Sequence, residues 1–143
     1  MKKLGVFLFL LTVAFPAWSW VYRGQGTAQN PYKVQTYEDL VHVGDFANQE
    51  GVHFRMTNDI VIHGHLWNPI GNFKGVFDGD GHHIVGEWIT SGNNGVGLFN
   101  RILSPGVVKN LTIDQAVITG GDWCGVLVST NGNWQEKGGT IIN

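Results

Sequence analysis

The chain has 143 residues, including 21 glycines, and its nine basic and eleven acidic side chains give a formal net charge of −2. This length fits a single domain. The sequence has no basic cluster that could neutralise a run of phosphates, which argues against a nucleic-acid partner. Because there is only one cysteine, an internal disulfide framework is excluded, and stability must come from apolar burial and backbone hydrogen bonds.

Residues 1–19 have the parts of a secretory signal peptide. Two lysines come first, and an apolar stretch at 6–15 follows that is too short for a stable bilayer span. Ala17 and Ser19 place small residues at the two positions that a signal peptidase reads, which predicts cleavage before Trp20. We therefore expect an exported protein, extracellular or at the cell surface, whose mature part does not span a membrane. The alternative is an uncleaved membrane helix.

Residues 20–71 are predicted to form an N-terminal cap region that ends in the first strands. Thr36 followed by Asp39 is a variant of the capping box, which satisfies free amides at a helix start, so we expect one helix over 37–48. Its apolar residues recur at helical spacing and are expected to cover the end of the structure that follows. They are Leu40, Val43, Phe46 and Ala47.

A repeated β-strand pattern organises residues 72–143. The stretch 106–110 matches 139–143, and Val96 to Phe99 corresponds to Cys124 to Leu127. Ile84 and Ile89 match Val108 and Ile113. Such repetition favours a stacked β-solenoid, with loops of unequal length between strands and an incomplete last coil. The predicted inward residues are Ile84, Ile89, Leu98, Val108, Leu111, Ile113, Ile118, Val126 and Ile141, with Cys124 as a small buried thiol.

Several motifs in this region have the same order as in a known group of proteins. The central one runs from Phe73 to Ile84, with glycines that permit tight turns and aspartates that can bond the turn amides. It follows Asn58-Asp59-Ile60 and precedes Val108-Lys109-Asn110-Leu111. The motif positions are Trp67, Pro69, Gly71, Phe73, Gly75, Phe77, Asp78, Gly79, Gly81, His82, Gly97, Leu98, Phe99 and Gly125.

Over residues 24–143 the chain resembles the GLUG-motif proteins of bacteria. The resemblance implies an exported all-β fold, a right-handed parallel β-helix, in a surface adhesin or in an accessory region of a secreted zinc metallopeptidase. Two departures are Asn100 and Val128, which replace the final glycine of the motif. The sequence contains no His-Glu-x-x-His peptidase signature.

Histidines are the first candidates for chemistry. His63 with His65, and His82 with His83, could supply imidazole ligands to a transition metal. Adjacent histidines on a strand point to opposite faces, however, so we expect no metal site and no cofactor.

A polysaccharide lyase or hydrolase is the alternative to a non-catalytic protein. Glycan hydrolysis needs two carboxylates that converge on one bond. The repeats place the available acids on turns or strand exteriors, without an evident convergent pair, so we expect no catalytic residue. These acids are Asp78, Asp80, Glu87, Asp114 and Asp122.

Tryptophans provide the remaining functional signal. Trp67, Trp88, Trp123 and Trp134 could pack in the core or stack on sugar rings. We expect Trp88 and Trp123 to contact ligand if they are exposed. The sequence thus favours a non-catalytic module of an adhesin-type protein, part of a longer chain, that binds a glycan or glycoprotein. Its open last coil is expected to allow end-to-end association.

Overall fold

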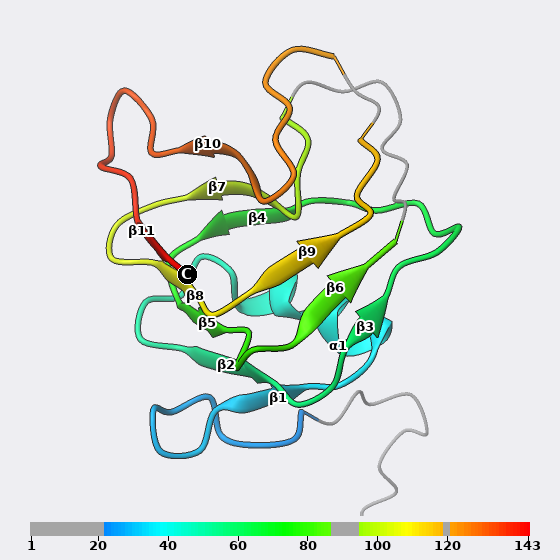
Figure 1. The fold of residues 1–143 in the computed structure, drawn as a ribbon. Helices are drawn as coiled ribbons and strands as arrows, with labels where there is room; N and C mark the ends of the chain where they lie inside the picture. Colours follow the sequence, from blue (N-terminus) through cyan, green and yellow to red (C-terminus); the bar gives the residue numbers. More distant parts are fainter. Residues whose placement is uncertain (1–21, 87–94, 119–120) are drawn as a thin grey trace, which may run out of the picture.

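The computed structural model describes residues 22–86, 95–118 and 121–143. The predicted signal peptide lies outside these residues, as do Glu87, Trp88 and Ile89. The described chain contains short strands, one α-helix and one 3-10 helix (Figure 1). In chain order they are β1 (Tyr32–Val34), α1 (Tyr37–His42), the 3-10 helix (Val43–Phe46), β2 (His53–Met56), β3 (Ile60–Val61), β4 (Ile70–Phe73), β5 (Val76–Asp78), β6 (His83–Val85), β7 (Phe99–Ile102), β8 (Val107–Lys109), β9 (Thr112–Asp114), β10 (Val128–Asn131) and β11 (Thr140–Ile142).

The strands form three small sheets in which hydrogen-bonded neighbours are parallel. The largest has the order β1-β2-β5-β8-β11, and the others have the orders β10-β7-β4 and β3-β6-β9. From β2 onward the chain contributes one strand to each sheet in turn, so segments far apart in sequence lie side by side (Figure 1).

This arrangement corrects the fold class that the sequence led us to expect. In place of a right-handed parallel β-helix, the described residues form three separate small sheets of parallel strands with one short helix. Strands of only two to four residues alternate with connections such as 86–98 and 115–127. Each sheet therefore remains a small unit. The expectation of a chain built mostly from strands is correct.

Strand register agrees with the sequence repeats in part. Thr140 pairs with Val107, as the match between 139–143 and 106–110 predicted. Ile84, however, pairs with Ile113, whereas Val108 pairs with Phe77. The match that we inferred thus joined β6 to β8, which belong to different sheets, whereas β6 pairs with β9 and β8 pairs with β5.

The start of the helix confirms the predicted capping box. Thr36 Oγ1 accepts a hydrogen bond from Asp39 N at 3.2 Å, and the Asp39 carboxylate accepts one from Thr36 N at 3.0 Å. Asp39 Oδ2 also accepts bonds from Gln35 N and from the Arg23 guanidinium, each at 2.8 Å. Predicted as one helix over 37–48, the segment instead becomes a 3-10 helix at Val43, next to a glycine of poor helix propensity.

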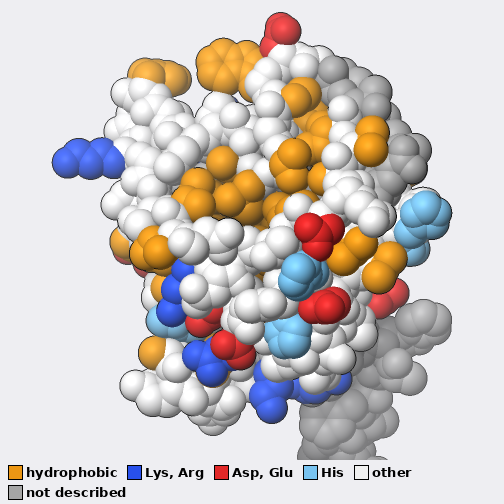
Figure 2. All heavy atoms as spheres, in the orientation of Figure 1, with side chains coloured by type: hydrophobic (Ala, Val, Ile, Leu, Met, Phe, Trp, Pro, Cys, Tyr) orange, Lys and Arg blue, Asp and Glu red, His pale blue; other side chains and the backbone are white. Residues whose placement is uncertain are grey.

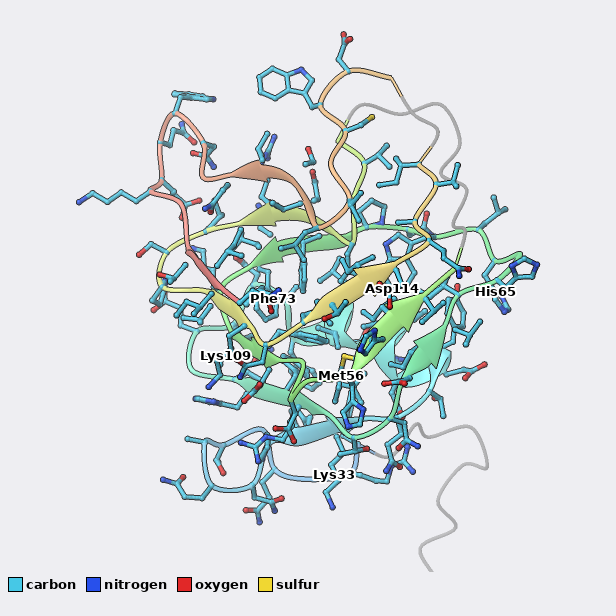
Figure 3. All side chains as sticks on the ribbon, in the orientation of Figure 1. Lys33, Met56, His65, Phe73, Lys109 and Asp114 are labelled. Carbon is cyan, nitrogen blue, oxygen red and sulfur yellow. The ribbon has the colours of Figure 1, made fainter. Side chains whose placement is uncertain are left out.

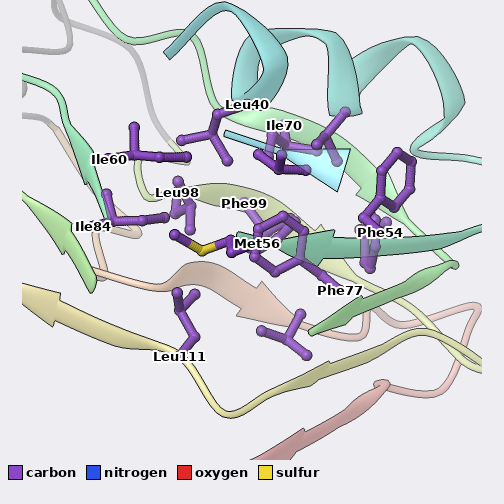
Figure 4. Close-up of a cluster of buried hydrophobic side chains, with 14 of the residues drawn as sticks. Leu40, Phe54, Met56, Ile60, Ile70, Phe77, Ile84, Leu98, Phe99 and Leu111 are labelled. Carbon is purple, nitrogen blue, oxygen red and sulfur yellow. The ribbon is translucent and has the colours of Figure 1, made fainter. Parts of the chain in front are cut away.

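The helical segment covers one end of the core, as expected. Leu40 and Val43 are fully buried, while Phe46 is only half-buried and packs its ring against Tyr22 and Tyr32. In Figure 4, Leu40 points from the helix toward Ile60 and Ile70.

Phenylalanines from two sheets fill the centre of the core. Phe77 of β5 and Phe99 of β7 have ring centroids 5.8 Å apart, and Phe99 lies 4.9 Å from Phe73 of β4. The third sheet contributes Ile60 and Ile84, which pair directly across β3 and β6 (Figure 4). All five side chains are almost completely buried, so side chains from the three sheets together form a single core.

Burial decreases toward the edge strands β9, β10 and β11. Val126 and Ile141, both predicted to point inward, are each 43% exposed. Cys124 forms the predicted bridge with Val96, yet its thiol is exposed rather than buried, because no described strand lies beyond β10. Figure 2 shows hydrophobic side chains gathered at the centre of this face, over β7 to β10.

Candidate functional site

A groove of about 490 Å³ lies over the outer side of β7 and β10. Two indoles, those of Trp123 and Trp134, line it together with polar side chains from the two strands. The polar side chains that form its floor are Asn100, Arg101, Ser129 and Thr130.

Sheet register places the floor residues. In β7, the end residues Phe99 and Ile102 are buried in the core, whereas Asn100 and Arg101 between them are half-buried. Parallel pairing sets Arg101 opposite Thr130 of β10 on one side and opposite Asn72 of β4 on the other. The middle strand of the sheet thus holds Arg101 between two uncharged polar neighbours.

The two indoles come from connections rather than strands. Trp123 is 65% exposed and has a φ of 66°, a left-handed conformation that is costly for a residue other than glycine. Trp134 is 90% exposed and lies in the turn after β10. Asn133 Oδ1 accepts backbone hydrogen bonds from Gln135 and Glu136, each at 2.7 Å, which fixes the turn that presents this indole.

The floor contains polar groups without protein partners. Among the described residues, Arg101 forms no ion pair. Thr130 Oγ1 is enclosed and has no hydrogen-bond partner there. Exposed indoles that share a groove with a guanidinium can stack on flat, partly apolar rings, while the guanidinium donates hydrogen bonds to the hydroxyls of those rings.

The candidate catalytic acids do not converge in this groove. Asp78 Oδ1 accepts bonds from Asn110 Nδ2 at 2.9 Å and from Asp80 N at 3.0 Å, and Asp78 Oδ2 lies 3.3 Å from Lys109 Nζ. Burial alone would raise the pKa of Asp78, but these hydrogen bonds and the Lys109 charge lower it overall. Asp114 lies on β9 (Figure 3), and Asp122 does not line the groove. Glu87 lies outside the described residues.

The histidines also lie apart from the groove. His63 and His65 are exposed in the β3–β4 connection, and the His65 ring stacks on Tyr37 with a centroid separation of 4.2 Å (Figure 3). His82 Nδ1 is 3.1 Å from Asp59 Oδ1, and His83 Nδ1 bonds Asp114 Oδ2. Within the described ranges, no three acid, histidine or cysteine side chains gather closely enough to hold a metal ion.

The His83–Asp114 pair predicts a pH effect of known sign. The hydrogen bond that His83 Nδ1 donates to the Asp114 carboxylate raises the pKa of His83 above its ordinary value of 6.5. The His83–Asp114 pair therefore stabilises the folded chain fully at pH values below 6.5. This contribution is lost as the pH rises through the raised pKa that His83 has in the folded chain. NMR titration of the His83 ring should give a raised pKa, and Asp114→Asn should lower it. Glu38→Gln, a change at an exposed position of α1, should leave the pKa of His83 unaltered. An unchanged His83 pKa in Asp114→Asn would contradict the pairing.

Sequence reasoning found only part of this site. Trp123 is exposed and lines the groove, which meets the condition that we set for a ligand contact. Trp88 lies outside the described residues. Trp67 belongs to the core, where its Nε1 donates to Gly97 O at 3.1 Å. Arg101 and Thr130 were missed, because only strand pairing shows that they are neighbours.

Comparisons with known proteins give two relatives. Over 128 residues the chain is 34% identical to halomucin of Haloquadratum walsbyi, and the aligned region covers 78% of this chain and 1% of halomucin. Over 108 residues it is 37% identical to a protein of Evansella cellulosilytica described as a Gly-rich membrane protein. That aligned region covers 67% of this chain and 12% of the relative. The chain thus spans a small part of each relative. Neither name denotes an enzyme.

Other comparisons give no match. No family model matches the chain, and no solved structure matches it. In the described part of the chain, neither helix has the length and apolar character needed to cross a bilayer.

Proposed function

We propose that this chain is a non-catalytic, glycan-binding module of an exported protein that acts at the cell surface or after secretion. The observation that carries the proposal is the pair of highly exposed indoles, Trp123 and Trp134, that line one groove with a polar floor. Exposed apolar surface that gathers in one groove marks an interaction site, and indole rings suit the apolar faces of sugar rings.

The chemistry of the groove supports binding rather than cleavage. Glycan hydrolysis uses two carboxylates about 5–10 Å apart across the scissile bond. Among the described residues, no carboxylate lines the groove, and Asp78 is occupied by Lys109 and Asn110 on another sheet. The names of the two relatives agree with a surface context, because one name describes a membrane protein and neither name denotes an enzyme. The adhesin-type role follows from the resemblance to GLUG-motif proteins.

The proposal predicts retention of a glycan without any product. The purified chain is passed over immobilised neutral and acidic polysaccharides, and the flow-through is assayed for new reducing or unsaturated ends. Replacing Trp123 and Trp134 together with alanine should weaken retention about tenfold, since each aromatic contact contributes about 0.5–1.5 kcal/mol. Leu66→Ala removes a side chain that is also exposed, at 71%, and does not line the groove. This control should retain full binding.

Three results would overturn the proposal. The first is binding that is unaffected by loss of both indoles, and the second is the absence of binding to every polysaccharide. The third is product release that disappears in Asp78→Asn or Asp80→Asn, which would establish the glycan-cleaving enzyme instead.

A further inference from the structure

The environment of Arg101 differs from that of the other basic side chains with known contacts. Arg23 lies 2.8 Å from Asp39, Lys74 lies 2.9 Å from Glu136, and Lys109 lies 3.3 Å from Asp78. Arg101 has no acidic partner among the described residues, although it is half-buried in the middle strand of its sheet. A partly desolvated cation without a counter-charge gains from an anion brought by a ligand.

The neighbours of Arg101 leave its guanidinium available. Asn72 and Thr130, which flank it in register, are uncharged, and no carboxylate of the described ranges lines the groove. The hydroxyl of Thr130, which is in register with Arg101, is enclosed and carries no charge that could neutralise the guanidinium. A guanidinium offers planar paired donors that match the two oxygens of a carboxylate or a sulfate.

We infer that the groove recognises acidic polysaccharides, with Arg101 pairing with a carboxylate or sulfate group while neighbouring sugar rings stack on Trp123 and Trp134. This inference rests on the proposed glycan-binding function and adds the charge of the ligand. It assigns separate roles to the parts of the groove. The indoles provide affinity for sugar rings of any charge, and Arg101 provides the preference for acidic ones.

Three polymers with one backbone test the inference. Dextran, carboxymethyl-dextran and dextran sulfate share their sugar and differ only in charged group, so they separate a carboxylate from a sulfate ligand and both from a neutral one. The full chain should bind at least one acidic polymer about tenfold more tightly than dextran at low salt, and added salt should reduce the difference. Arg101→Gln should abolish this preference, so that the acidic polymers bind this variant no more tightly than dextran binds it. Arg101→Lys, which keeps the charge but not the paired donors, should retain part of it.

Lys33→Gln is the matched control, because it removes the same charge from an exposed side chain on β1, the outermost strand of another sheet (Figure 3). It should leave the preference intact. Equal loss in Lys33→Gln and Arg101→Gln would show general charge attraction and overturn the inference. Equal binding of all three polymers, abolished by loss of the indoles, would overturn it while leaving the glycan-binding function in place. Binding of none of the three polymers would overturn both the inference and the glycan-binding function.

Thermal melting checks that each variant folds, and Arg101→Gln should melt like the native chain because it breaks no ion pair of the described residues.

Discussion

Replacing Phe77 with alanine is expected to lower the free energy of unfolding by about 3–5 kcal/mol, the usual cost of removing a buried phenylalanine. Its side chain is completely buried, and its ring meets that of Phe99 edge-to-face at 5.8 Å. In the sheet it stands between Phe54 of β2 and Val108 of β8. The cavity would therefore open where the neighbouring strands β2, β5 and β8 of one sheet meet β7 of another.

Urea denaturation followed by circular dichroism measures this loss, and Phe46→Ala is the matched control. Phe46 belongs to the 3-10 helix and is only half-buried, so its truncation should cost clearly less than that of Phe77. Equal losses in the two variants would show that the core is not centred on the phenylalanines of the sheets.

Replacing Gly79 with alanine is the second change with a large expected effect. A Cβ at this position would lie 2.4 Å from Asn110 O and 2.7 Å from the Cα of Leu111, both backbone atoms of the neighbouring turn. The two turns would have to separate, and the hydrogen bond from Gly79 N to Lys109 O at 2.8 Å would lengthen. Overpacking of this kind costs about 1–3 kcal/mol.

Gly71→Ala provides the control, since a Cβ there meets nothing within 4 Å. It should be neutral or slightly stabilising, because alanine reduces the conformational entropy of the unfolded chain. Melting temperatures of the two variants compare them directly. If Gly79→Ala melted no lower than Gly71→Ala, the close approach of the turns would be refuted.

Local signals in the sequence were the most reliable guide to the fold. The Thr36–Asp39 box identified the start of the helix because capping depends on residues three positions apart. The match that pairs Thr140 with Val107 was also visible, since both segments follow a glycine and alternate in the same way. The arrangement of the sheets was predicted wrongly, as a β-helix, because it depends on where each corner interrupts hydrogen bonding. The pairing of Ile84 was also wrong, because the apparent repeat joined β6 to β8, a strand of another sheet.

The candidate site was less accessible to sequence reasoning. Trp123 attracted notice by residue type alone, but nothing in its local sequence connects it with Trp134 or Arg101. They line one groove because β7 and β10 pair across almost thirty residues of intervening chain. Cys124 illustrates the complementary error. Its register with Val96 was correct, but burial depends on what lies beyond a strand, and β10 is an edge.

The three connections that lead into β4, β7 and β10 have a consequence for how this protein can change. They occupy 62–69, 86–98 and 115–127. The first is shorter than the other two, and all three differ in composition, although the strands on either side of them stay paired. Trp123 lies in one of them and Gly95 of the groove in another. Substitutions in these connections can therefore change the lining of the groove while the phenylalanine core stays constant, much as antibody loops vary on a fixed framework. The same separation makes the corner a place to graft foreign peptide segments for display.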